Sequence, residues 1–175
     1  MNRSHNFFSL FELPLSSEVD AILLEQKYKQ LQARLHPDRQ VTPDDSGKLA
    51  AIQQASILND GYATLRSPLR RAEHLLQLTG IDTSVYNQAD IDKDFLLAQL
   101  KLREELEELQ LQPSPEALEA LQAKAEKELE SIWTEFSAQF ASGNYQAAYL
   151  AFRELQFLQK LIDEIRETED RLLDY

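Results

Sequence analysis

The sequence has no cysteine, few glycines and prolines, and no long uncharged apolar run. The absence of cysteine excludes disulfides, thiolate nucleophiles and metal centres held by cysteines of this chain. With four glycines and six prolines among 175 residues, a fold built from many tight turns is disfavoured. No apolar run approaches the roughly 18 residues of a membrane span, so no membrane partner is expected. Residues 1–10 match neither a secretory signal nor a transit peptide, which favours a protein of the bacterial cytoplasm.

The charge is strongly acidic and unevenly spread. Acidic residues outnumber basic ones by 30 to 18, for a net charge of −12, which disfavours nucleic acid as a partner. Residues 1–80 carry nine of each sign, whereas residues 81–175 carry nine basic and 21 acidic residues. The change coincides with Gly80, which is predicted to end a helix. We therefore predict two domains, 1–79 and 91–175, joined by a linker over 80–90.

The first half predicts four helices. Apolar residues recur at helical spacing, and Ser16 or Ser17 and Ser67 are suitable N-caps. The predicted segments are about 6–13, 17–35, 48–66 and 67–79. The third segment has a predicted inward face of Leu49, Ile52, Ala55, Leu58, Tyr62 and Leu65. Two long antiparallel helices flanked by two short ones make a small helical domain.

The loop between the two long helices opens with the tripeptide His36-Pro37-Asp38. One reading is a simple helix stop, because proline disfavours helical backbone in the residue before it. The preceding helix is basic, with Lys27, Lys29 and Arg34. Cations near a helix C-terminus also interact favourably with the helix dipole, so they do not by themselves indicate a binding surface.

In combination, these features resemble a J domain, the module that activates DnaK-type chaperones. The resemblance rests on the tripeptide, the basic helix, and Asn59, Tyr62 and Leu65 on the following helix. It implies that the tripeptide contacts the chaperone and promotes its ATP hydrolysis, and that the three cations dock on it. Residues 67–76 resemble the last J-domain helix of the HscB family, the J proteins of iron–sulfur cluster assembly. In that family tyrosine is more usual at His74, interpreted here as a packing residue, and alanine at Gly61.

The second half predicts three long helices over about 92–111, 115–140 and 144–173. Their short connections imply antiparallel neighbours and hence an up-down-up three-helix bundle. The predicted fold class is therefore all-α, with an N-terminal J domain and a C-terminal three-helix bundle.

The first helix of this bundle has two apolar faces. Its core stripe consists of Phe95, Leu102, Leu106 and Leu109. At 100° per residue, the second face lies about 140–150° away from that stripe. This face holds Leu96, Leu97 and Leu100, bordered by Arg103 and Glu104. Phe157 lies off the stripe of the last helix, level with Leu96, so one apolar patch rimmed by charge is predicted, as partner sites often have. Packing on the first domain or in a homodimer is the alternative.

Residues 94–106 also resemble the HscB segment that binds the cluster scaffold protein IscU, and Phe157 matches an aromatic contact on the last helix. The resemblance implies a scaffold-binding site made of Leu96, Leu97, Leu100, Arg103, Glu104 and Phe157. It further implies an HscA-type chaperone and IscU as partners. The expected function is to stimulate the chaperone's ATP hydrolysis and to deliver the scaffold to it.

Two other readings compete with this one. For an enzyme, the three histidines have no repeated spacing, Glu-x-x-His does not occur, and no phosphate-binding glycine loop is present. We therefore expect no catalytic residue, metal or cofactor. The other reading is an elongated coiled coil over residues 92–173, against which the short loops favour a compact bundle.

Overall fold

The computed structural model describes residues 6–35, 45–84 and 91–173. Over these ranges the chain forms helices and no strand, which confirms the predicted all-α fold class. The chain divides into two compact units, Met1–Gly80 (unit 1) and Ile81–Tyr175 (unit 2).

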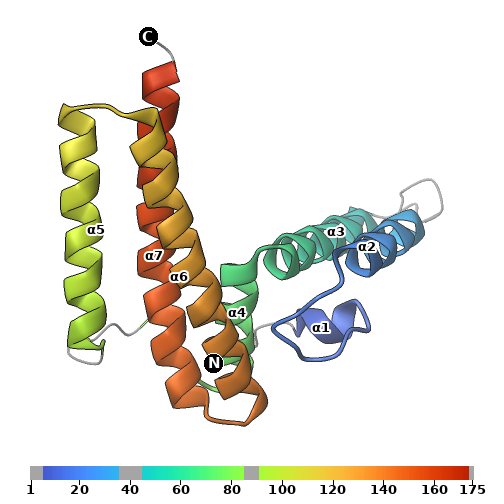
Figure 1. Ribbon diagram of the computed structural model, residues 1–175. Coiled ribbons are helices and arrows are strands. Elements are labelled where there is room, and N and C mark those ends of the chain that lie inside the picture. Colours follow the sequence, from blue (N-terminus) through green and yellow to red (C-terminus); the bar gives the residue numbers. More distant parts are fainter. Residues whose placement is uncertain (1–5, 36–44, 85–90, 174–175) are drawn as a thin grey trace. The chain divides into compact units, whose positions relative to one another are not determined.

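Unit 1 is built around an antiparallel helix pair (Figure 1). Its elements are α1 (Phe7–Leu10), α2 (Ala21–Leu35), α3 (Asp45–Arg66) and α4 (Pro68–Leu78). The rings of Tyr28 on α2 and Tyr62 on α3 stack with their centroids 4.2 Å apart. The Tyr28 hydroxyl donates to Asn59 Oδ1 at 2.9 Å. These contacts set the register of α2 on α3.

Helix α2 begins later than the sequence predicts. Asp20 Oδ1, rather than a serine hydroxyl, accepts the backbone N–H groups of Ile22 and Leu23 at 2.9 and 3.1 Å. The predicted cap Ser17 is buried, and its carbonyl accepts the Arg71 guanidinium at 2.7 Å. The chain therefore runs in a non-helical path from Ser17 to Asp20 before the helix starts.

The inward face predicted for α3 is only partly correct. Leu58 and Leu65 are buried, but Leu49 and Ile52 are 58% and 66% exposed. The Tyr28 contacts place Leu35, the last residue of α2, opposite roughly residue 53 of α3. The first two turns of α3 therefore extend past the end of α2, which leaves Leu49 and Ile52 without a packing partner on α2.

The short helix α1 carries the aromatic core of unit 1. Phe8 and Phe11 are 1% and 0% exposed. A Cβ atom at Gly61 would lie only 2.9 Å from Phe7 Cδ1, so glycine permits the close approach of α1 to α3. The His74 ring stacks on Phe7 with centroids 4.7 Å apart, and its Nε2 accepts the Phe7 backbone N–H at 3.2 Å. His74 thus packs, as expected, and also anchors the start of α1.

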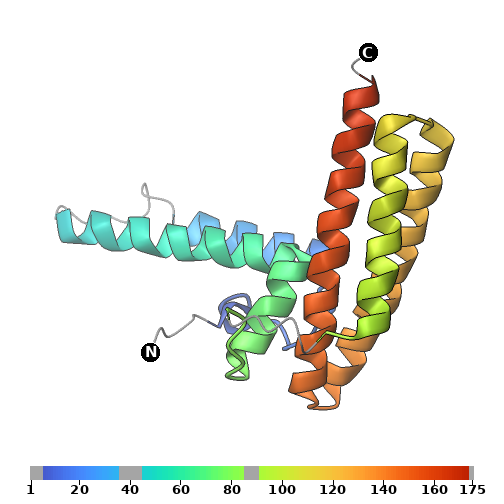
Figure 2. The same cartoon turned by 90° about the vertical axis from the view of Figure 1, so that its left-hand side faces the viewer.

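Unit 2 is a three-helix bundle of α5 (Lys93–Leu111), α6 (Pro115–Ala141) and α7 (Tyr145–Leu173). Asp92 and Ser114 cap α5 and α6, which explains why the predicted boundaries agree closely. Helices α6 and α7 pack along their length, and α5 lies against both (Figure 2). The main core cluster consists of Leu102, Leu106, Leu118, Leu121, Ala125, Leu161, Ile162 and Ile165.

The buried imidazole predicts a pH dependence for unit 1. Burial lowers the pKa of His74 below 6.5, against a smaller opposing effect of Asp60. Because the unfolded chain binds the proton more readily, the stability contributed by neutral His74 is lost as the pH falls below about 6.5. An NMR titration should show the His74 midpoint below 6.5, and the unfolding free energy of His74→Phe should lack this loss. A midpoint at or above 6.5 would contradict the assignment.

Unit 2 is expected to respond to pH in the opposite direction. The pKa of Glu154 on α7 is raised to about 7, first by burial and then by neighbouring carboxylates. These carboxylates are Glu135, Asp92 and Glu128. Since the folded pKa exceeds the ordinary 4.5, the stability contributed by Glu154 rises as the pH falls from about 7 to about 4.5.

Glu154→Gln should therefore stabilise unit 2 at pH 8 by about 1–2 kcal/mol, after allowance for solvent screening of a half-buried group, and by less at pH 5. Urea unfolding followed by fluorescence of Trp133, the single tryptophan, measures this directly. Glu130→Gln, at an exposed position of α6, is the matched control. Equal effects of both variants at pH 8 would argue against a perturbed Glu154.

Candidate functional site

The two apolar faces of α5 meet different surroundings. Asp92 Oδ1 accepts the backbone N–H groups of Asp94 and Phe95 at 2.9 and 3.0 Å, which fixes the start of the helix. The predicted core stripe faces inward, with Leu102 and Leu106 each 3% exposed. On the second face Leu97 and Leu100 are 56% and 53% exposed. One face thus builds the bundle, and the other presents apolar side chains to solvent.

The leucine patch, defined as Leu96, Leu97, Leu100 and Phe157, spans α5 and α7. Leu96 and Phe157 are partly buried and pack on the same small cluster of Ile91, Phe95 and Leu158. The Phe157 ring meets Phe95 edge-on, with centroids 6.5 Å apart. The structure therefore brings Leu96 and Phe157 to one small cluster, and Leu97 and Leu100, on the same helix as Leu96, are more exposed than either.

The two charged residues at the rim of the leucine patch, Arg103 and Glu104, differ in their surroundings. Arg103 Nη1 donates to Glu164 Oε2 at 2.8 Å, with side chains 35% and 32% exposed. Arg103 is thus engaged across the α5–α7 interface, whereas Glu104 is exposed to solvent. Periodicity could not find Glu164, because a helical stripe does not reveal which carboxylate a distant cation meets.

In unit 1, two of the three predicted docking cations already have partners. Lys27 donates to Glu12, and Lys29 pairs with Glu25. The hydrogen bond and charge of Lys27 lower the pKa of Glu12, and those of Glu25 raise the pKa of Lys29. Arg34, in the last turn of α2, adds a weaker attraction to Glu12. Lys27 and Arg34 therefore share the Glu12 side of α2.

Lys29 lies on another side of α2, near Glu25 and Tyr62. Both ion pairs are solvent-accessible, so a partner's carboxylates could replace Glu12 and Glu25 at low cost. The tripeptide His36-Pro37-Asp38 lies outside the described residues, and its proposed role rests on the sequence.

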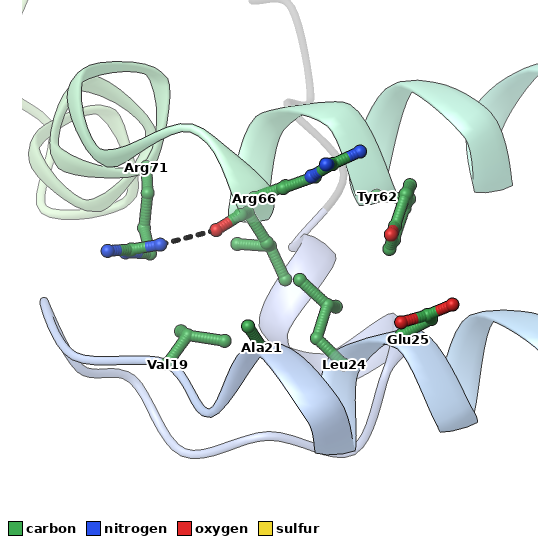
Figure 3. A pocket seen from close by; sticks show the side chains of 8 residues that line it. Val19, Ala21, Leu24, Glu25, Tyr62, Arg66 and Arg71 are labelled. Atoms are coloured by element: carbon green, nitrogen blue, oxygen red, sulfur yellow. Dashed lines mark hydrogen bonds between the residues drawn. The ribbon is translucent and has the colours of Figure 1, made fainter.

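A pocket of about 160 Å³ lies between the start of α2 and the end of α3 (Figure 3). Apolar side chains including Leu24 and Leu65 line it, and the Arg71 guanidinium donates to the Leu65 carbonyl. The volume is below the roughly 300 Å³ at which ligand pockets begin. Burial lowers the pKa of Arg71, but its hydrogen bonds to backbone carbonyls hold it as a structural cation.

Neither a metal centre nor a membrane segment emerges from the described residues. Over these ranges, no group of three or more histidine, aspartate or glutamate side chains could hold a metal ion. None of the described helices is long and apolar enough to cross a bilayer. The candidate surfaces are therefore the leucine patch and the three basic residues of α2, Lys27, Lys29 and Arg34.

Comparison with known proteins identifies the family. A family model described as the HSCB C-terminal oligomerisation domain matches residues 91–166. The co-chaperone protein HscB homolog of Vibrio cholerae is 41% identical over 169 residues, 96% of this chain and 99% of the relative. The homolog of Shewanella baltica is 35% identical over 173 residues, covering 97% and 99%.

Solved structures agree with the sequence comparison. Chaperone HscB from Vibrio cholerae superposes with a TM-score of 0.83 at 41% identity, covering 95% of this chain and 99% of that one. The human co-chaperone protein HscB, at 23% identity, shares the fold with a TM-score of 0.86, covering 97% and 84%. HscB co-chaperones are not enzymes. With 41% identity over nearly the whole of both chains, the protein belongs to the HscB family, the co-chaperones of iron–sulfur cluster assembly.

Proposed function

We propose that this protein stimulates ATP hydrolysis by an HscA-type chaperone of the DnaK class and delivers the scaffold protein IscU to it. Delivery would assist iron–sulfur cluster assembly and transfer, in the bacterial cytoplasm. The observation that carries the proposal is the exposure of Leu97 and Leu100 on a helix whose other face is fully used by the bundle core. Family membership and the bacterial relatives support the same reading.

The leucine patch is suited to bind a protein surface. Burying apolar area is worth about 25 cal/mol per Å², so two half-exposed leucines contribute roughly 1 kcal/mol each. Phe157 adds a ring already held in place by Phe95, which reduces the entropy lost on binding. Glu104 at the rim adds charge that selects the orientation of the partner.

The basic residues of α2 (Lys27, Lys29 and Arg34), together with His36, Pro37 and Asp38, are proposed as the chaperone-binding surface. Lys27 and Lys29 would exchange Glu12 and Glu25 for acidic groups of the chaperone, and Arg34 would add a third cation. Because one chain carries both surfaces, binding of the scaffold to unit 2 raises its effective concentration at the chaperone bound by unit 1. Modest individual affinities are therefore sufficient for delivery.

The chaperone-binding half is tested by the steady-state ATPase rate of HscA with this protein, with and without IscU. We expect stimulation by this protein and a further, synergistic increase with IscU. His36→Gln should abolish the stimulation while leaving the far-ultraviolet circular dichroism unchanged. Stimulation that persists in His36→Gln would contradict the role of the tripeptide, and stimulation without synergy would point to a client other than IscU.

The scaffold-binding half is tested with Leu97→Ser/Leu100→Ser. The double variant should weaken IscU binding in calorimetry by at least about tenfold, the loss expected for roughly 1.4 kcal/mol or more of apolar burial. Its stimulation of HscA without IscU should equal that of the wild type. Leu111→Ser is the matched control, since Leu111 is 84% exposed on the same helix but outside the patch. Equal IscU affinity for the double variant and this control would rule out the patch.

A further inference from the structure

The leucine patch depends on how α5 is aligned with α7. Both helices run antiparallel to α6, so they are parallel to each other (Figure 1). Arg103 follows Leu96 by seven residues, and Glu164 follows Phe157 by seven. Seven residues are about two helical turns, so each later residue lies on nearly the same side of its helix. The Arg103–Glu164 ion pair therefore lies two turns further along the interface in which Leu96 and Phe157 pack on the same cluster.

Polar side chains also lie along this interface. Next to the patch the helices meet through apolar groups, the Phe95 and Phe157 rings among them. Gln99, one turn before Arg103, is 5% exposed, and its Nε2 has no hydrogen-bond partner among the described residues. Beyond the ion pair, Gln110 Nε2 donates to Thr168 Oγ1 at 3.2 Å. Arg103–Glu164 is thus an ion pair that joins α5 to α7 between these two positions.

Apolar contacts are non-directional, so they constrain the alignment of two helices less narrowly than a directional contact does. An ion pair two-thirds removed from solvent, at 2.8 Å, fixes the two helices much more narrowly. We propose that Glu164 is a positioning residue of the scaffold-binding patch, which acts by holding Arg103 and thereby the register of Leu96 and Leu100 beside Phe157. In this role Arg103 serves the shape of the patch rather than a direct contact with the partner.

The inference rests on the proposed scaffold-binding function and is tested by charge exchange. The variants are Arg103→Glu, Glu164→Arg and the two together, with IscU affinity measured by calorimetry. Each single variant places like charges face to face and should weaken binding by about three- to tenfold, within the usual range for coupled pairs. The double variant restores opposite charges and should recover most of the affinity. A purely direct role of Arg103 predicts no recovery, and that result would overturn the proposal.

A second pair of helices offers the matched control. Arg166 on α7 pairs with Glu126 on α6 at 3.1 Å, away from α5. Arg166→Glu should lower stability to a similar extent without changing IscU affinity. An equal loss of affinity in Arg166→Glu would show that the effect reports bundle stability, and would overturn the positioning role.

Two further measurements separate the possible failures. The nuclear Overhauser contacts between the Phe95 and Phe157 rings should weaken in each single variant and return in the double variant, and unchanged contacts throughout would contradict the proposal. If Leu97→Ser/Leu100→Ser binds IscU like the wild type in the same titrations, the scaffold-binding function itself fails. If that variant loses affinity and the single charge variants do not, only the positioning role fails.

Discussion

Burial of one face of α5 is the constraint on which the rest of unit 2 depends. Leu102 and Leu106 join the core of α6 and α7, so this helix can take only one rotation about its axis. That rotation turns Leu97 and Leu100 away from the core. The two apolar faces of α5 lie on nearly opposite sides of the helix, so only one of them can face α6 and α7. The exposure of Leu97 and Leu100 therefore follows from the burial of the other face.

Unit 1 depends on a comparable constraint, the close approach of an aromatic helix to α3. Gly61 removes the side chain that would meet Phe7, at the cost of roughly 1 kcal/mol of helix propensity. Phe8 and Phe11 are buried in return, and His74 closes the cluster by stacking on Phe7. The small size of α1 is thus compensated by aromatic burial rather than by its own helical stability.

Local signals in the sequence predicted most helix boundaries and the all-α class, because a cap such as Ser67 and the spacing of apolar residues act within a few residues. They failed where the burial or the partner of a residue depends on a segment that is distant in the chain. Periodicity assigned Leu49 and Ile52 to a packed face, but it holds no information on where the partner helix ends. Ion pairs such as Arg103–Glu164, 61 residues apart, leave no local trace at all. For the same reason the sequence could not explain Gly61, because the Phe7 ring that it accommodates is distant in the chain.

The division of charge between the units implies two different modes of recognition. Unit 1 is neutral overall, and two of the three cations proposed to dock on the chaperone are held in ion pairs. The proposed chaperone binding would therefore exchange one set of charges for another and would weaken with salt. Unit 2 carries the whole net charge of −12, yet its leucine patch is apolar, and Arg103 at the rim of the patch is paired with Glu164. The proposed scaffold binding would gain mainly from apolar burial, which salt does not screen. Under this proposal, added salt would weaken the contact with the chaperone more than the contact with the scaffold.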